Sequence, residues 1–377
     1  MRFFDSLIVG AGPAGGMLAY ELSRQGLRVL ILEKEALPRY KTCGGGLTFK
    51  VAALLPFDIG SICETEVDMA LVSYRGGQAL LARHENIVGW TVRRDRLDYF
   101  LLQKALEAGA ELAEKTKVIS VELSPRRATV QTDKGRFCGE ILAGADGAYS
   151  LVASALGLRS KKLLAVALSM EAEVSEETLE RYRRCVAFDF GAVPKGYAWI
   201  FPKKDHLSTG IFSLSRKIKN LRKILLAFLD KNLGDYKKIL LRGHLIPLGG
   251  GQEVLHKGRA LLVGDAAGLA DPIWGEGIYY ALKSARLAAE SIRKALAGGM
   301  ARLEDYTWEV NAQILSEFRY ARRIALFLYN FPGLSYRLFI KNRGVVGHAA
   351  ELLRGDMSYK KFYAGLLKDV LAGILGR

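Results

Sequence analysis

The sequence predicts an α/β protein with a second, antiparallel-sheet domain and a helical C-terminal region. Three patterns along the 377 residues support this prediction. Residues 4–32 read as strand, glycine-rich turn, helix and strand, residues 161–250 alternate in the manner of strands, and residues from 301 onward follow helical periodicity. Half of the residues are hydrophobic, so the chain has enough apolar material for a large core and is not expected to be disordered.

The elements of the first domain follow one another in βαβ order. The apolar run 4–9 predicts a strand, residues 13–25 predict a helix, and residues 28–32 predict a second strand. A further helix is predicted over 97–108. A buried strand at 259–263 then leads into a long helix.

A glycine motif joins the first strand to the first helix. Residues 10–15 read Gly-Ala-Gly-Pro-Ala-Gly, which is the G-x-G-x-x-G spacing of a dinucleotide-binding turn. In such a turn the first glycine permits the bend, the second lets a pyrophosphate approach the backbone, and the third lets helix pack on strand. The helix N-terminus attracts the phosphates, and Glu33 ends the second strand where an acid binds a ribose hydroxyl. This predicts a Rossmann-like domain without separating NAD from FAD.

Later segments favour FAD. Residues 264–268 (Gly-Asp-Ala-Ala-Gly) resemble the G-D motif of flavoproteins, whose aspartate binds the ribityl chain. Residues 145–148 (Ala-Asp-Gly-Ala) resemble the D-G motif of the same superfamily, that of the aromatic hydroxylases, and Arg94 is similar to an arginine that those enzymes place near the flavin. Residues 271–278 turn the chain into a helix whose N-terminus would stabilise the negative charge of a reduced flavin.

An aromatic strand is predicted in the second domain. Tyr197, Trp199 and Phe201 alternate along residues 194–202, so their rings share one face if the segment is a strand. Residues 207–213 are expected to return as the next strand after a tight turn. The rings form either the core of the sheet or a wall for a long apolar substrate, and periodicity alone leaves both interpretations open.

Two motifs together make a family resemblance specific. The Pro-x-x-Tyr-x-Trp-x-Phe-Pro pattern of 194–202 and the Lys-Thr-Cys-Gly-Gly-Gly-Leu segment at 41–47, combined with the flavin motifs, resemble the geranylgeranyl reductase family over about residues 1–300. The resemblance implies noncovalent FAD, a β-sheet substrate domain and a tunnel for a polyprenyl chain. It also implies hydride transfer from reduced flavin to an isolated C=C bond of a prenyl lipid or prenylquinone, with a proton delivered to the other carbon.

The candidate site residues follow from these motifs. Cys43 is the candidate for shaping the site or for taking part in proton delivery, with a packing role as the alternative. The residues expected to bind FAD are Gly10, Gly12, Pro13, Ala14, Gly15, Glu33, Lys34, Cys43, Gly44, Gly45, Arg94, Asp146, Gly264, Asp265, Gly275, Gly277 and Ile278. The residues expected to bind substrate are Tyr197, Trp199, Phe201 and Pro202. No metal site is expected, because the cysteines and histidines are scattered.

These interpretations define the predicted domain boundaries. The FAD-binding domain is expected to comprise 1–70, 91–160 and 255–300, the antiparallel-sheet substrate domain 71–90 and 161–254, and the helical region 301–377.

The formal net charge of +16 is unevenly distributed. Residues 318–377 contain eleven Lys or Arg, three Asp or Glu and ten aromatic residues, a net charge of +8. Such helices suit an anionic membrane surface, or they form a cap on the substrate domain with a solvated basic face. Nucleic acid is not supported, because no nucleic-acid motif accompanies the charge. Scattered cysteines and the lack of a spanning apolar run predict a cytoplasmic protein, peripheral at the inner face of the membrane.

Two other functions share part of this pattern. One is an FAD-dependent monooxygenase of an aromatic or quinone-type substrate, and the other is a non-catalytic prenyl-lipid carrier. The intact glycine motif and Asp265 argue against the carrier. No second nucleotide fingerprint is visible, so NAD(P)H, reduced ferredoxin and quinol stay open as electron donors.

Overall fold

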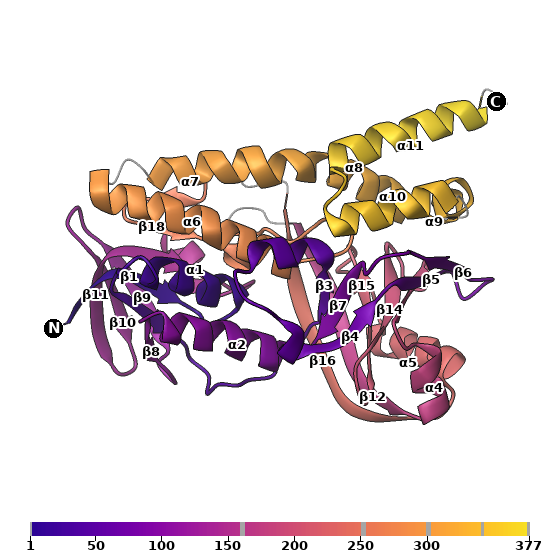
Figure 1. Cartoon of the computed structure of the whole chain (residues 1–377), viewed down its shortest axis with the longest axis horizontal. Coiled ribbons are helices and arrows are strands. Elements are labelled where there is room, and N and C mark those ends of the chain that lie inside the picture. The colour runs from indigo at the N-terminus through magenta and orange to yellow at the C-terminus, as the bar shows by residue number, and fades with distance from the viewer. Residues whose placement is uncertain (1, 159–162, 250–253, 299–302, 341–342, 375–377) are drawn as a thin grey trace. The chain divides into compact units, whose positions relative to one another are not determined.

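Two compact units make up the structure, a computed structural model that describes residues 2–158, 163–249, 254–298, 303–340 and 343–374 (Figure 1). Each unit is assembled from three separate stretches of chain. The parallel-sheet unit consists of Met1–Lys41, Arg94–Leu163 and Pro247–Ser316. The antiparallel-sheet unit consists of Thr42–Arg93, Leu164–Ile246 and Glu317–Arg377.

The parallel-sheet unit is built around a mostly parallel sheet in the order β17-β18-β11-β1-β2-β8, with β10 and β9 added antiparallel beside β11. Its strands are β1 (Phe3–Val9), β2 (Val29–Leu32), β8 (Glu111–Ala113), β9 (Val118–Leu123), β10 (Ala128–Thr132), β11 (Gly135–Gly144), β17 (His256–Lys257) and β18 (Ala260–Leu262). Its helices are α1 (Pro13–Ser23), α2 (Arg94–Glu107), α3 (Leu151–Ala155), α6 (Ile278–Gly298) and α7 (Leu303–Val310).

The apolar runs of this sheet explain its architecture. β2 and β18 are buried along their whole length, as expected for parallel strands covered on both faces. Helix α1 packs against α2 and α6 (Figure 1). The predicted α/β class with a Rossmann-like domain is confirmed.

Helix α1 begins and ends where its sequence dictates. Pro13 occupies the first turn, where its missing N–H has no intrahelical partner to lose. The helix ends at Ser23, two residues earlier than predicted, and Gly26 adopts a left-handed φ of +81° that completes the turn into β2.

The antiparallel-sheet unit contains a seven-stranded sheet in the order β16-β12-β15-β14-β13-β5-β6 and a small sheet β3-β7-β4. Its strands are β3 (Gly46–Thr48), β4 (Cys63–Val67), β5 (Met69–Tyr74), β6 (Leu80–Arg83), β7 (Gly89–Val92), β12 (Leu163–Val174), β13 (Cys185–Phe190), β14 (Gly196–Pro202), β15 (Leu207–Ser213) and β16 (Tyr236–Leu248). Its helices are α4 (Glu176–Arg181), α5 (Leu221–Leu233), α8 (Ser316–Asn330), α9 (Pro332–Ser335), α10 (Arg343–Arg354) and α11 (Tyr359–Ile374).

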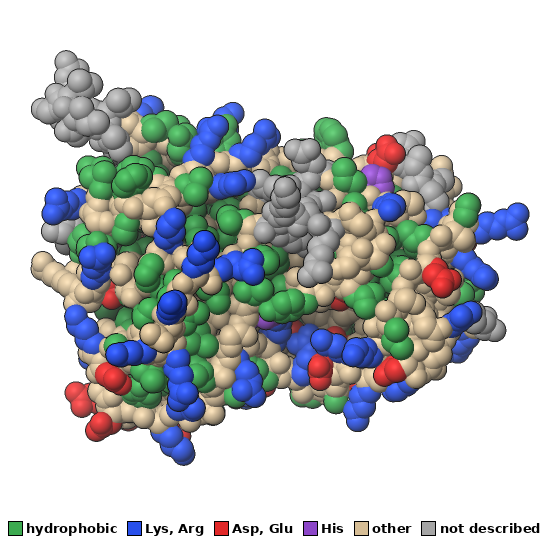
Figure 2. Space-filling model, turned by 180° about the vertical axis from the view of Figure 1, so that it is seen from behind, with side chains coloured by type: hydrophobic (Ala, Val, Ile, Leu, Met, Phe, Trp, Pro, Cys, Tyr) green, Lys and Arg blue, Asp and Glu red, His purple; other side chains and the backbone are tan. Residues whose placement is uncertain are grey.

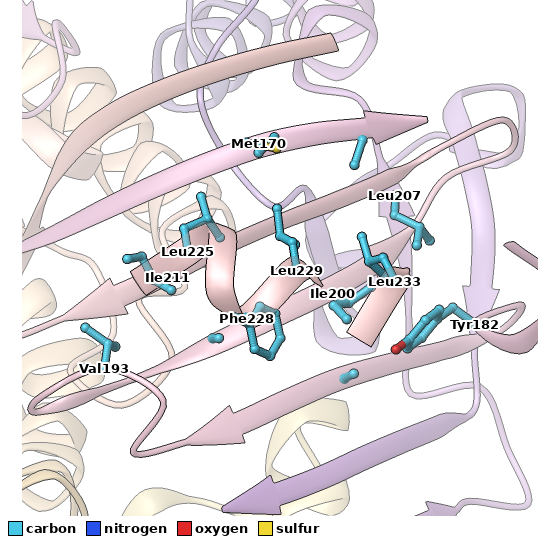
Figure 3. Close-up of a cluster of buried hydrophobic side chains, with 13 residues drawn as sticks. Met170, Tyr182, Val193, Ile200, Leu207, Ile211, Leu225, Phe228, Leu229 and Leu233 are labelled. Atoms are coloured by element: carbon cyan, nitrogen blue, oxygen red, sulfur yellow. The ribbon is translucent and has the colours of Figure 1, made fainter. Parts of the chain in front are cut away.

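The two faces of the large sheet carry different side chains. On one face, Ile200 and Ile211 pack with Leu225, Phe228 and Leu229 of the amphipathic helix α5, which closes a hydrophobic core (Figure 3). Strand alternation therefore turns Tyr197, Trp199 and Phe201 to the opposite face. The predicted hairpin of residues 194–213 is confirmed by the antiparallel register of β14 and β15.

The two compact units divide the chain at other residues than the predicted domain boundaries. Residues 42–70 lie with the antiparallel-sheet unit, because β3 and β4 both pair with β7. The C-terminal helices from Glu317 onward also belong to this unit, whereas 303–316 belong to the other. The predicted boundary between residues 160 and 161 lies outside the described part of the chain.

The C-terminal helices contact the strands of their own unit. The Tyr336 hydroxyl donates to the Gln78 carbonyl at 2.7 Å, and its ring stacks on Tyr74. The Arg354 guanidinium lies 4.3 Å from the centre of the Phe49 ring and donates to the Ile87 carbonyl. These contacts join α10 and the turn of helix that follows α9 to β5 and to the segments next to β3, β6 and β7.

Candidate functional site

The glycine turn after β1 has the geometry that each glycine of the motif requires. Gly10 has a φ of +103°, and a Cβ there would lie 2.5 Å from the Ala145 carbonyl oxygen. A Cβ on Gly15 would lie 1.9 Å from the Gly10 carbonyl oxygen, so helix and strand meet closely. A Cβ on Gly12 would meet only an Arg39 nitrogen, at 4.0 Å. The space in front of Gly12 is therefore open to a ligand, while Gly10 and Gly15 serve the fold.

The acid at the end of β2 organises the same turn. Glu33 is buried and accepts hydrogen bonds from the Ala11 N–H at 2.8 Å and the Glu35 N–H at 3.0 Å. A carboxylate fixed by two backbone donors holds its orientation and keeps lone pairs for a hydroxyl ligand. Lys34, which follows it, is exposed.

Sequence reasoning missed a charge cluster beside Gly12. The buried Asp98 carboxylate accepts from Arg94 at 2.8 and 3.0 Å and from Arg39 at 3.1 Å. Two guanidinium groups share this carboxylate, and Arg39 Nε also lies 3.9 Å from the Glu33 carboxylate, so two cations and two anions stand beside a turn suited to pyrophosphate. The only sequence signal for Arg39 and Asp98 was the local density of cations around residues 39–41 and 93–96.

The D-G and G-D segments both reach this turn. The Ala145 carbonyl faces Gly10, and a Cβ on Gly264 would lie 3.0 Å from the Ala14 Cβ. The Asp146 carboxylate accepts from the Leu151 and Val152 N–H groups, at 2.7 and 3.1 Å, and so caps α3. Burial raises the pKa of Asp146, against these hydrogen bonds and that of Ser150. The contacts of Asp146 in the structure are thus structural.

The segment before α6 is a loop that is hydrogen-bonded to its own buried aspartate. Asp271 is fully buried, and its Oδ1 accepts from the Ile273 and Trp274 N–H groups, both at 2.8 Å. Gly275 has a φ of +67°, and a Cβ on Gly277 would lie 3.2 Å from Asp265 Oδ1. The half-buried Asp265 carboxylate and the buried Ile278, where α6 begins, therefore stand beside each other.

These features fit a bound FAD. The open Gly12, the Arg39 and Arg94 guanidinium groups and the free N–H groups at the start of α1 suit a pyrophosphate, and Glu33 and Asp265 offer carboxylates for hydroxyl groups. Pro13 and Ala14 form the buried first turn of α1. All of these residues lie in the parallel-sheet unit, whereas Cys43, Gly44 and Gly45 lie in the other.

The Cys43 segment packs directly on the aromatic strand. A Cβ on Gly44 would lie 3.1 Å from the Phe201 ring and 3.1 Å from Trp199 Nε1, and one on Gly46 would lie 3.1 Å from Phe201. The Gly45 N–H donates to Cys43 Sγ at 3.3 Å, and Gly45 has a φ of +67°. At Gly45 only glycine fits, because a Cβ would lie 2.0 Å from the Val92 carbonyl oxygen, and the glycines on either side let the segment pack tightly on Phe201. The structure thus brings together the two motifs that carried the family resemblance.

The aromatic face is larger than the three rings that the sequence indicated. The Phe188 ring meets the rings of Tyr197 and Phe201 edge to face, with 5.6 Å between ring centres in each pair. The Phe212 ring stacks on Tyr197, with 5.2 Å between ring centres. The buried Trp199 Nε1 has no hydrogen-bond partner among the described residues. Because buried N–H donors are usually hydrogen-bonded, an indole N–H without an acceptor indicates that a ligand or a water molecule binds at this face.

A buried lysine was also missed. Lys203 follows β14 directly, is 5 % exposed, and donates through Nζ to the Gly44 carbonyl at 2.8 Å and the Val92 carbonyl at 3.0 Å. Burial lowers the pKa of Lys203 to about 8, against the opposing effects of Glu171 and Cys43. In the sequence Lys203 appears only as part of a charged turn.

Comparison with known proteins agrees with this geometry. A family described as an FAD binding domain matches residues 4–55. The chain is 30% identical over 318 residues to digeranylgeranylglycerophospholipid reductase 2 of Methanothermobacter thermautotrophicus, covering 78% of this chain and 79% of that one. It is 32% identical over 308 residues to the chloroplastic geranylgeranyl diphosphate reductase of Nicotiana tabacum, covering 76% of this chain but only 65% of the plant protein.

A solved structure shares the fold. The crystal structure of a geranylgeranyl bacteriochlorophyll reductase-like protein from Thermoplasma acidophilum superposes with a TM-score of 0.80 at 24% identity, covering 87% of this chain and 88% of that one.

Proposed function

Since the chain belongs to the geranylgeranyl reductase family and is an FAD-dependent oxidoreductase, we propose that it saturates isoprenoid C=C bonds of a prenyl lipid, prenylquinone or related polyprenyl compound. The observation that carries this proposal is the packing of the Cys43–Gly-Gly-Gly run on the aromatic face of β14. The monooxygenase alternative is not favoured, because the named relatives are reductases.

The proposed reduction gives separate roles to the cofactor, the aromatic face and Cys43. When bound, reduced FAD supplies a hydride to one carbon of the double bond. Tyr197, Trp199 and Phe201 offer an apolar face that would hold an isoprenoid segment and exclude water, which matters because an isolated double bond is unactivated. Pro202 ends this strand, and its carbonyl accepts from the Thr91 hydroxyl at 2.6 Å. The half-buried Cys43 is our candidate for giving a proton to the other carbon.

The reductase activity is tested with the purified, flavin-containing protein. The flavin is reduced anaerobically with NADPH, with reduced ferredoxin or with dithionite, and the protein is then incubated with geranylgeranyl lipids and prenylquinones. We expect products whose mass increases by pairs of hydrogens. A reduced flavin that yields no such product on any isoprenoid contradicts the proposal, and incorporation of oxygen from air would support the monooxygenase instead.

We further propose that the C-terminal helices bind an anionic membrane surface. Phe331, Leu334 and Leu338 are 57 %, 47 % and 37 % exposed and lie close together in the chain, at and just after the start of α9. At the upper left of Figure 2, where the C-terminal helices lie, hydrophobic side chains are interspersed with Lys and Arg and few Asp or Glu are seen. Within the described residues no helix is both long and apolar enough to cross a bilayer. Apolar side chains among cations suit the interface of a bilayer with anionic lipids.

Replacing these apolar side chains tests the membrane proposal. We expect Phe331→Asp with Leu334→Asp to weaken binding to anionic phospholipid vesicles about tenfold or more, because two anions replace apolar contacts. Ile119→Asp, on β9, is the control, because Ile119 is also 55 % exposed but lies in the other unit. Cosedimentation is measured at low and high salt with anionic and with zwitterionic vesicles. Equal binding by the two variants contradicts the proposal.

A further inference from the structure

A row of ionisable side chains leads from the surface of the antiparallel-sheet unit toward the Cys43 segment. It begins at Asp205, whose side chain is 73 % exposed and lies 2.5 Å from Nδ1 of His206. Nε2 of His206 lies 3.3 Å from the Glu171 carboxylate, which also accepts from the Ser208 hydroxyl at 3.3 Å. A histidine between two carboxylates has donors on both ring nitrogens and therefore carries a proton that it can pass on.

The inner end of the row is Lys203. Its ammonium has three N–H donors, of which two are used by the Gly44 and Val92 carbonyls. The turn that connects β14 to β15 places it near the outer groups, because the Lys203 N–H donates to the His206 carbonyl at 2.9 Å. Nζ reaches the Cys43 segment through the carbonyl of Gly44, the residue that follows Cys43, and both Glu171 and Cys43 act on the Lys203 ammonium through charge.

The position of this row matches a need of the proposed reaction. Saturation of a double bond takes up one hydride and one proton, and among the rings described on the aromatic face only the Tyr197 phenol is ionisable. Glu171 pairs across the sheet with Ser208, and Ser208 pairs with Phe201, so the row borders the end of the aromatic face. A proton from water thus has a path along side chains that flank this face.

We propose that His206, Glu171 and Lys203 form a relay that carries a proton from water at Asp205 to Cys43, an inference that rests on the proposed reductase function. In each cycle the Cys43 S–H bond breaks and a C–H bond forms on one substrate carbon, while the other carbon takes the hydride of reduced FAD. The thiolate then takes a proton from the Lys203 ammonium. The His206 imidazolium gives a proton to the Glu171 carboxylate, which passes it to the Lys203 amine. Because Lys203 Nζ hydrogen-bonds only to the Gly44 and Val92 carbonyls among the described residues, its exchanges with Glu171 and Cys43 run through bridging water. One proton from water restores the row, so charge and atoms balance.

The charges around the relay set its pH response. Lys203 is influenced by Glu171, Cys43, Glu64 and Arg93, and the Glu64 carboxylate also accepts from the Lys204 N–H at 3.2 Å. Burial opposes the charged form of His206, but its hydrogen bonds to Glu171 and Asp205 outweigh burial and raise its pKa. We therefore expect turnover to fall as the pH rises above about 8, where Lys203 loses its proton.

The relay is tested by comparing variants of its members with matched controls. We expect His206→Gln and Glu171→Gln to lower kcat about tenfold or more with KM little changed, and to enlarge the solvent isotope effect in D2O. Imidazole added to His206→Ala is expected to restore part of the rate. The control His84→Gln removes a half-buried histidine of the same unit whose ring hydrogen-bonds to the backbone of Asn86.

Lysine variants separate proton transfer from positioning. Lys203→Arg keeps a cation for the two carbonyls but does not release a proton near neutral pH, so we expect it to remain slow, as Lys203→Met does. The control Lys231→Met removes an exposed ammonium that donates to the Gly76 carbonyl at 2.7 Å. Full recovery of the rate by Lys203→Arg shows a positioning role and overturns the relay.

The outcomes distinguish the relay from the reductase function. If the wild-type protein reduces isoprenoids while His206→Gln and Glu171→Gln keep its pH profile and isotope effect, the relay alone is wrong. If the wild-type protein with reduced flavin reduces no isoprenoid, the proposed function is wrong and the relay falls with it. Flavin content and thermal unfolding are measured for each variant, so that a loss of rate caused by misfolding is recognised. If one of His206→Gln and Glu171→Gln does not fold, the pH profile and isotope effect of the other decide whether the relay exists.

Discussion

Gly12→Val is expected to yield a folded protein that has lost its flavin. Gly12 has a φ of −77° and a ψ of −174°, an extended conformation that valine adopts readily. A Cβ there would meet only an Arg39 nitrogen, at 4.0 Å, so the backbone around the turn has no clash with it. It instead fills the space through which a pyrophosphate reaches the backbone. We expect the flavin content per chain to fall about tenfold or more, measured by absorbance of the purified protein.

Two other glycines of the same unit serve as references for this result. Gly298→Ala, at the end of α6, has no atom within 4 Å of the added Cβ and is expected to retain both fold and flavin. Gly15→Ala would place a Cβ 1.9 Å from the Gly10 carbonyl oxygen and is expected to reduce soluble, folded protein. Full flavin content in Gly12→Val would show that the cofactor does not approach the backbone at this turn.

Phe201→Ala is expected to impair turnover far more than folding. Phe201 lies half-buried on the aromatic face, against Gly44 and Gly46. Removing its ring takes away apolar surface for an isoprenoid segment, and we expect kcat/KM for a geranylgeranyl lipid to fall about tenfold or more while flavin stays bound.

Replacing the neighbouring Ile200 is expected to impair folding far more than turnover. Ile200 is 1 % exposed and packs in the core with α5, so Ile200→Ala is expected to lower the free energy of unfolding by about 3 kcal/mol. The kcat/KM of the remaining folded protein should change little. Unfolding in urea and steady-state rates measured on both variants give the comparison. If both variants lose stability and activity in parallel, the aromatic face is simply sheet core and the proposed substrate wall is wrong.

The elements that depend on local sequence were predicted closely. The β1–turn–α1–β2 unit and the β14–β15 hairpin follow from periodicity, glycine and proline within a few tens of residues. Local patterns also predicted that the rings of Tyr197, Trp199 and Phe201 share a face. They did not show whether α5 or the Cys43 segment covers that face, because this depends on packing between distant segments.

The rest of the candidate site depends on partners that are remote in sequence. Arg39 and Asp98 are 59 positions apart, and Lys203 and Gly44 are 159 apart, so no window of sequence reveals either pair. Asp146 shows a different limit of prediction from sequence. The D-G motif singled out this residue, but it did not reveal that the carboxylate accepts hydrogen bonds from the first N–H groups of α3. Buried charges become interpretable only when their partners are known.

The division of each unit into three stretches has a consequence for synthesis of the protein. The chain passes from one unit to the other at 41/42, 93/94, 163/164, 246/247 and 316/317, and β18 near residue 260 completes the parallel order with β11. A ribosome that has made the glycine turn must therefore add more than two hundred residues before that strand is present. Neither unit can therefore be expressed as one uninterrupted fragment. During most of its translation the nascent chain exposes unpaired strand edges. Chaperones have the greatest opportunity to bind it in this period.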